Sequence, residues 1–150
     1  MKYTETKGDL FSAPSDYYLA HCISADFGMG KGIVVEFNKR FDMKNKLKRY
    51  HPHYLAYYDS QVKLGIEGTC LIEGKVLNLI TKRNYWLKPT YKSMAQALAD
   101  MKTIVITHHI KKIAMPVIGC GLDRLNWDKV SSIIKDTFND LDVEITVYSI

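Results

Sequence analysis

The sequence is poor in cysteine and proline, and it has no long hydrophobic run. Its 150 residues include only three cysteines and four prolines. The cysteines, Cys22, Cys70 and Cys120, are too far apart for a disulfide framework or a zinc ribbon, so we expect reduced thiols. No apolar stretch approaches the roughly 20 residues that cross a bilayer, and the first residues lack a signal-peptide core. These absences predict a soluble, cytoplasmic protein.

Histidine is also sparse, with five residues in the chain. Neither His51 and His53 nor His108 and His109 stand at a standard metal-binding spacing from cysteine or carboxylate. We therefore expect no metal, and nothing in the sequence calls for another cofactor.

What is present is the composition of an ordinary globular chain. Hydrophobic residues make up 47% and charged residues 25%, and the length suits a single domain spanning residues 1–150. We expect a monomer. The net charge of +5 favours anionic ligands, either nucleotides or nucleic acid.

Basic residues concentrate in one stretch, where they could contact phosphates. The alternative is a solvated face of helix and loop, which the lack of a recognised DNA-binding motif favours. The stretch contains Lys39, Arg40, Lys44, Lys46, Lys48 and Arg49.

Strand and helix patterns alternate along the whole chain, which predicts a layered α/β domain with helices covering a mixed sheet. We expect strands over residues 2–6, 17–23, 69–72, 75–80, 112–117 and 144–148. Helices are expected after Lys31, after a Thr90 cap and after an Asn126 cap. Between residues 44 and 58 we expect a short helix, followed by irregular chain where Pro52 interrupts it.

Two glycine-containing loops, residues 28–32 and 118–123, each lie between a predicted strand and a predicted helix. Free backbone N–H groups and a helix dipole at such a junction can face an anion, and glycine lets the phosphates approach the backbone. The pair predicts a diphosphate clamp. The first loop fits neither a Walker A motif, because Ala25 and Gly32 replace required residues, nor a Rossmann fingerprint, because of Ile33.

Six motifs stand along the chain: KGDLF at residues 7–11, HCIS at 21–24, MGKGI at 29–33, LITK at 79–82, KPTY at 88–91 and MPVIGCGLDRL at 115–125. Taken together, they resemble the macro domain family, and most closely its terminal ADP-ribose protein glycohydrolase branch. They occur in the family's order and extend the resemblance over nearly the whole chain. The resemblance implies a three-layer α/β/α fold with a central mixed, mostly parallel sheet.

The resemblance also implies roles for individual residues. Asp9 and the Leu10 backbone would recognise adenine, the glycine loops would hold the diphosphate and distal ribose, and Ser24 would contact that ribose. Lys82 would attack the anomeric carbon, and Asp123 would complete turnover. The implied ADP-ribose-binding positions are Asp9, Leu10, His21, Ser24, Met29, Gly30, Gly32, Ile33, Thr81, Pro116, Ile118, Gly119, Cys120, Gly121, Leu122 and Tyr148.

The residue types allow the same chemistry. An unprotonated lysine can displace a carboxylate from ribose C1″ and form an imine, and an aspartate within reach can act as the general base. Because lysine has an ordinary pKa of about 10.4, Lys82 needs desolvation or a neighbouring cation, to which Arg83, Tyr85 and Trp86 could contribute. Cys120 has no histidine near it in sequence, so we interpret it as a packed thiol.

The sequence therefore predicts an ADP-ribosyl hydrolase that acts on ADP-ribosylated acidic residues or on O-acyl-ADP-ribose. An ADP-ribose 1″-phosphate phosphatase is a second hypothesis. A reader that binds ADP-ribosylated protein or DNA without turnover is a third. The basic stretch keeps ADP-ribosylated DNA open as a substrate, and no membrane partner is expected.

Overall fold

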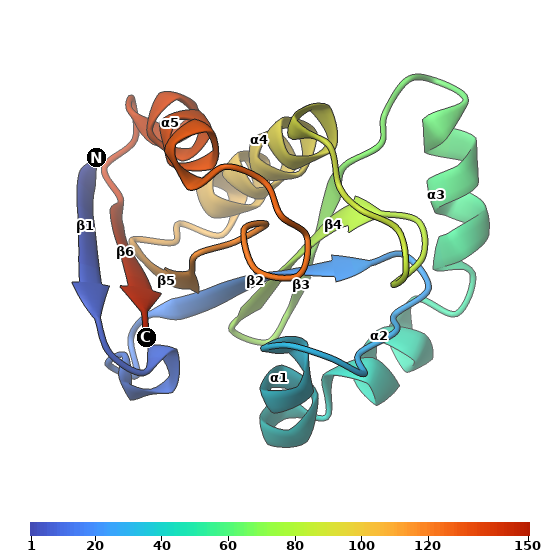
Figure 1. Cartoon of the computed structure of the whole chain (residues 1–150), viewed down its shortest axis with the longest axis horizontal. Helices are drawn as coiled ribbons and strands as arrows, with labels where there is room; N and C mark the ends of the chain where they lie inside the picture. Colours follow the sequence, from blue (N-terminus) through green and yellow to red (C-terminus); the bar gives the residue numbers. More distant parts are fainter.

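A computed structural model describes residues 1–150, and its centre is one six-stranded sheet (Figure 1). The strand order is β1-β6-β5-β2-β4-β3, and every neighbouring pair is parallel except β3 with β4. The prediction of a mixed, mostly parallel sheet is confirmed. The strands are β1 (Lys2–Lys7), β2 (Tyr18–Ser24), β3 (Thr69–Glu73), β4 (Val76–Lys82), β5 (Lys112–Pro116) and β6 (Glu144–Ser149).

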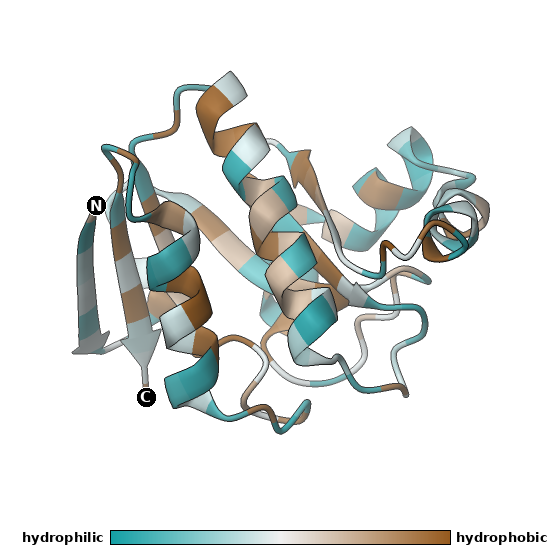
Figure 2. Ribbon diagram, turned by 90° about the horizontal axis from the view of Figure 1, so that it is seen from above, coloured by the Kyte–Doolittle hydropathy of each residue, from teal (hydrophilic) through white to brown (hydrophobic).

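Helices cover both faces of the sheet, which gives the three-layer arrangement. In Figure 1, α4 and α5 lie on one face, and α1 and α2 lie on the other. Figure 2, which looks down on the first face, shows α4 and α5 side by side with hydrophobic and hydrophilic residues alternating along them. The helices are α1 (Val34–Phe41), α2 (Met43–Tyr50), α3 (Tyr54–Val62), α4 (Tyr91–Thr107) and α5 (Trp127–Phe138), with a short 3-10 helix, η1 (Leu10–Ser12).

The sheet separates two apolar cores, and its central strands are buried on both sides. Every residue of β4 except Lys82 is buried. The core on the α4 and α5 side contains Met101 and Phe138, whereas the other contains Phe37 and Leu47. Burial on both sides is what a mostly parallel sheet requires, since its helical crossovers cover both faces.

The segment after Pro52 differs from its prediction. The irregular chain occupies only residues 51–53, and α3 begins at Tyr54. Pro52 precedes the helix, where its missing N–H breaks no helical bond. Tyr54 and Tyr58, one helical turn apart, are both buried, and their hydroxyls bond the Thr69 side chain and the Glu67 carbonyl. These tertiary contacts stabilise a helix that local sequence did not indicate.

Thr90 caps α4, as the sequence predicts. Its hydroxyl accepts a hydrogen bond from the Ser93 amide at 3.0 Å, and the Ser93 hydroxyl in turn accepts one from the Thr90 amide at 3.0 Å. This reciprocal capping box satisfies two of the donors that a helix start leaves free. It also fixes the point at which the chain leaves the loop after β4.

Replacing this cap should weaken the fold. We expect Thr90→Ala to lower the free energy of unfolding by about 1 kcal/mol, because the Ser93 amide loses its partner. Chemical denaturation of the purified protein measures the change. Thr103→Ala, an exposed position within the same helix, is the control and should leave stability unchanged or slightly raise it. Equal losses in both variants would contradict the capping role.

Candidate functional site

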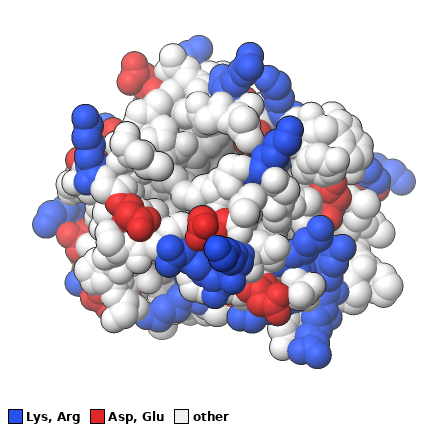
Figure 3. All heavy atoms as spheres, turned by 60° about the horizontal axis from the view of Figure 1, so that its bottom comes forward, with Lys and Arg blue, Asp and Glu red and all other residues white.

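A groove of about 1310 Å³ crosses the carboxyl ends of the parallel strands. Because β6, β5, β2 and β4 are neighbours that run in the same direction, the residues that end them meet at one edge of the sheet. Ser149, Pro116, Ser24 and Lys82 end these four strands in that order, and all line the groove. Figure 3 shows a hollow with mainly uncharged walls and both basic and acidic side chains around its rim.

The first glycine loop forms one wall and leads into α1. The amides of Gly30, Lys31 and Gly32 donate to no acceptor in the protein, and α1 starts without a side-chain cap. Gly32 has a φ of +77°, a conformation that favours glycine. Unpaired amides at an uncapped helix start form a favourable site for an anion.

The second glycine loop faces the first across the groove. The amides of Gly119, Cys120, Gly121 and Leu122 also donate to no acceptor in the protein. A Cβ atom on Gly32 would lie 3.6 Å from Leu122 Cδ1, so the two loops approach each other closely. Two sets of free amides on opposite walls suit an extended, doubly charged group such as a diphosphate.

The helix after the second loop, α5, does not direct its amino-terminal end at the groove, contrary to the prediction. Asn126 caps α5 by accepting a hydrogen bond from the Lys129 amide at 3.2 Å. Neither Asn126 nor Trp127 lines the groove. The helix dipole expected at this loop is therefore absent from the site, and only loop amides face the groove here.

Lys82 and Asp123 meet in the wall of the groove. The Lys82 Nζ atom donates a hydrogen bond to Asp123 Oδ1 at 2.7 Å. Their side chains are only 14% and 17% exposed, respectively. Lys82 ends β4, whereas Asp123 lies in the second glycine loop. An amine and a carboxylate at this distance can exchange a proton directly, which is the arrangement expected of a nucleophile and its base.

No family model matches the chain, but individual relatives do. The human ADP-ribose glycohydrolase OARD1 is 39% identical over 150 residues, which cover 99% of this chain and 92% of that protein. This chain belongs to the macro domain ADP-ribose glycohydrolases.

Two further comparisons agree with this assignment. The DNA ADP-ribosyl glycohydrolase of Mycobacterium tuberculosis is 26% identical over 157 residues, covering 97% of this chain and 41% of that protein. The macrodomain structure of Thermus aquaticus DarG has a TM-score of 0.73 at 22% identity, with 99% of this chain and 98% of that chain covered. The likeness to DarG supports the macro domain fold.

Most of the predicted site residues of this glycohydrolase line the groove. Ser24 pairs in register with Lys82, whereas Asp9, Leu10 and Tyr148 lie toward β1 and β6 at the other end of the strand order. Those that line the groove are Asp9, Leu10, Ser24, Gly30, Gly32, Ile33, Lys82, Pro116, Ile118, Gly119, Gly121, Leu122, Asp123 and Tyr148.

Four predicted positions, His21, Met29, Thr81 and Cys120, lie outside the groove lining. His21, Met29 and Thr81 are buried in the core, and the Cys120 thiol turns back to donate to the Ile118 carbonyl at 3.3 Å. These side chains therefore do not form the groove surface, and a ligand contact at these four positions stays a prediction.

The structure adds groove residues that the sequence did not single out as ligand-binding positions. At the Asp9 end, the guanidinium of Arg40 lies 4.3 Å from the centre of the Phe11 ring and pairs with Glu36. Helical spacing from the first glycine loop could have indicated Glu36 and Arg40. The other additions to the lining are Gly8, Cys22, Ile23, Gly28, Lys31, Val34, Tyr85, Trp86, Leu87, Lys88, Val117, Ser149 and Ile150.

The surroundings of Lys82 and Asp123 differ from expectation in one respect. The Arg83 guanidinium binds both carboxylate oxygens of Asp59, at 2.8 and 3.0 Å, so it supplies no neighbouring cation to Lys82. Burial raises the pKa of the Cys22 thiol, and the Asp123 charge raises it further, which keeps Cys22 protonated beside the pair. Burial likewise raises the pKa of Cys120. Neither thiol is activated as a nucleophile.

His21 lies deeper, beneath the groove. Its ring stacks on Phe37 with ring centroids 3.7 Å apart, and its Nε2 atom hydrogen-bonds Asn78 Oδ1 at 2.6 Å. Burial lowers the pKa of His21 to about 4, although the bond to Asn78 opposes the shift. His21 is therefore a neutral structural residue at physiological pH.

This buried histidine makes stability depend on pH. The unfolded chain takes up a proton near pH 6.5 and the folded chain only near pH 4, so stability is lost as the pH falls between these values. We expect the His21 contribution to fall by about 2 kcal/mol from pH 7 to pH 5. Denaturation at both pH values, compared with His21→Gln, measures it. An identical pH dependence in the variant would exclude this assignment.

Proposed function

We propose that this glycohydrolase binds ADP-ribose along the groove and releases it from acidic side chains, or deacylates O-acyl-ADP-ribose. The contact between Lys82 and Asp123, in the wall of a groove with two amide-lined loops, is the observation that carries the proposal. Lys82 acts as the nucleophile and Asp123 as the base. We also propose that the enzyme acts as a cytoplasmic monomer, because one chain supplies the whole groove and its three cysteines are free.

The order of the strands supports one orientation of ADP-ribose along the groove. Adenine lies against Asp9 and Leu10, beside β1 and β6, and the diphosphate lies between the two glycine loops. The distal ribose then reaches Ser24 and Lys82 at the ends of β2 and β4. One Asp9 oxygen already accepts from the Phe11 amide at 3.0 Å, which leaves the other for the adenine amino group.

The reaction proceeds through the lysine. Asp123 accepts a proton from the Lys82 ammonium, and the free amine attacks ribose C1″, from which the carboxylate or acyl oxygen departs with its electron pair. Asp123 returns that proton to the departing oxygen and is ionised again, and a proton moves from the attached nitrogen to the ring oxygen as the sugar ring opens to an imine. Water, activated by Asp123, adds to the imine, restores the amine and releases ADP-ribose.

ADP-ribosylated DNA is a second candidate substrate. The M. tuberculosis relative is named a DNA ADP-ribosyl glycohydrolase, and this chain carries basic residues along α1 and α2. The phosphatase and reader hypotheses use the same groove. Phosphate release from ADP-ribose 1″-phosphate identifies the phosphatase, whereas binding without product identifies the reader.

The two proposed roles predict different effects for substitutions of Lys82 and Asp123. Lys82→Ala should abolish turnover while ADP-ribose still binds with micromolar affinity, about −8 kcal/mol, because the glycine loops remain. Asp123→Asn should lower kcat by roughly 10² to 10⁴. Product release is measured from ADP-ribosylated glutamate protein, O-acetyl-ADP-ribose, ADP-ribose 1″-phosphate and ADP-ribosylated DNA, and binding is measured by calorimetry.

Lys112→Ala provides the matched control, since Lys112 also pairs with an aspartate, Asp16 at 2.9 Å, but lies outside the groove. It should retain full turnover. Full activity in Lys82→Ala would refute the lysine mechanism.

A further inference from the structure

The carboxylate of Asp26 joins two segments of the site without lining the groove. Its Oδ1 atom accepts hydrogen bonds from the Ser24 hydroxyl and, at 3.1 Å, from the Gly28 amide. Its Oδ2 atom accepts from the Tyr85 amide at 3.3 Å and the Asn84 side chain at 3.4 Å. The Oδ1 atom therefore binds the first glycine loop, and the Oδ2 atom binds the segment that follows Lys82.

The same two segments also touch through backbone and packing. The Asp26 amide donates to the Arg83 carbonyl at 3.0 Å, and the Ala25 amide donates to the Lys82 carbonyl at 2.9 Å. A Cβ atom on Gly28 would lie only 2.8 Å from the Tyr85 ring. Glycine at position 28 is thus required for the close approach of Tyr85 to the first glycine loop.

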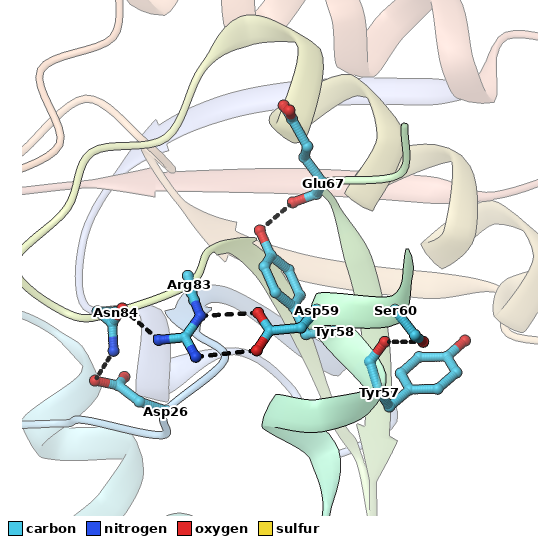
Figure 4. A network of polar contacts seen from close by, with 8 residues as sticks. All are labelled: Asp26, Tyr57, Tyr58, Asp59, Ser60, Glu67, Arg83 and Asn84. Carbon is cyan, nitrogen blue, oxygen red and sulfur yellow. Dashed lines mark hydrogen bonds and ion pairs between the residues drawn. The ribbon is translucent and has the colours of Figure 1, made fainter. Parts of the chain in front are cut away.

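An ion pair with α3 holds the segment that follows Lys82 from its other side, as Figure 4 shows. The Arg83 guanidinium binds Asp59 of α3 with two parallel hydrogen bonds. It also donates to the Asn84 side-chain oxygen at 3.1 Å, which turns the amide nitrogen of Asn84 toward Asp26. Bidentate pairs of this kind fix geometry as well as adding energy.

Asp26 is charged in this setting. Burial by itself would raise the pKa of the carboxyl, but the hydrogen bonds from Ser24, Gly28, Tyr85 and Asn84 together lower it below its ordinary value. Hydrogen bonds to an ionised carboxylate are stronger than those between neutral groups. The charge therefore strengthens all four bonds that tie the two segments together.

We propose that Asp26 is a positioning residue. It holds the first glycine loop and the segment around Lys82 at a fixed separation, so that both act on the same bound ligand. This inference rests on the proposed function, since it requires Lys82 to be the nucleophile. The glycine loop places the diphosphate and therefore ribose C1″, whereas the Lys82 segment places the amine. Asp26 sets the separation between the two, and small displacements of reacting groups cost large factors in rate.

Asp26→Asn tests this role, because an amide has an acceptor on one side only. Since the bonds to Ser24 and Gly28 are the shorter ones, the amide oxygen should keep them, and the amide nitrogen then faces the donors of Asn84 and Tyr85. We expect kcat to fall by about tenfold and ADP-ribose affinity to change by less than about threefold. Steady-state kinetics measures kcat, and calorimetry measures the affinity for ADP-ribose.

Gly28→Ala provides a second, independent variant, since its Cβ atom displaces Tyr85 from the same contact. Its effect on kcat should not add to that of Asp26→Asn in the double variant, because both changes release the same segment. Asp140→Asn is the control, since it removes an aspartate that pairs with Lys102 at 2.8 Å outside the groove. It should leave kcat unchanged.

The outcomes separate this inference from the proposed function. Wild-type protein without turnover, or fully active Lys82→Ala, would refute the lysine mechanism. An active wild type with inactive Lys82→Ala and full-rate Asp26→Asn would overturn only the positioning role. Equal losses of kcat and ADP-ribose affinity in Asp26→Asn, or additive effects in the double variant, would also overturn it.

Discussion

The site depends on one constraint, the parallel alignment of β6, β5, β2 and β4. Parallel strands need crossover connections, so all four strands end at the same edge of the sheet, and β5, β2 and β4 each lead into a loop there. The loops are thereby brought together although they are far apart in sequence. Lys82 and Asp123, 41 positions apart, come into hydrogen-bond contact for this reason.

The two glycine loops present different kinds of N–H donors to the groove. The first combines free amides with the uncapped start of α1. The second offers loop amides only, because Asn126 already satisfies the start of α5. Both walls thus present N–H donors, but the helix dipole acts from one side, which favours negative charge near the first loop.

Rigidity around Lys82 and Asp123 comes from charge-assisted hydrogen bonds and packing among the segments next to Lys82. Asp26 bonds the backbone of two loops, Arg83 is anchored to α3, and Tyr85 packs on Gly28. The α3 segment, which is absent from the sequence prediction, is part of this support. A helix that carries no groove residue therefore contributes to the geometry of the site.

The sequence by itself determined the layered architecture, both glycine loops, the Thr90 and Asn126 caps and the candidates Lys82 and Asp123, because these features are encoded locally. Apolar periodicity, strand-to-helix junctions and capping side chains all act within a few residues. Only the tertiary structure decided which residues face the groove. It buried His21, Met29 and Thr81, turned Arg83 toward Asp59 and folded α3 onto β3, since side-chain direction and long-range packing depend on partners distant in sequence.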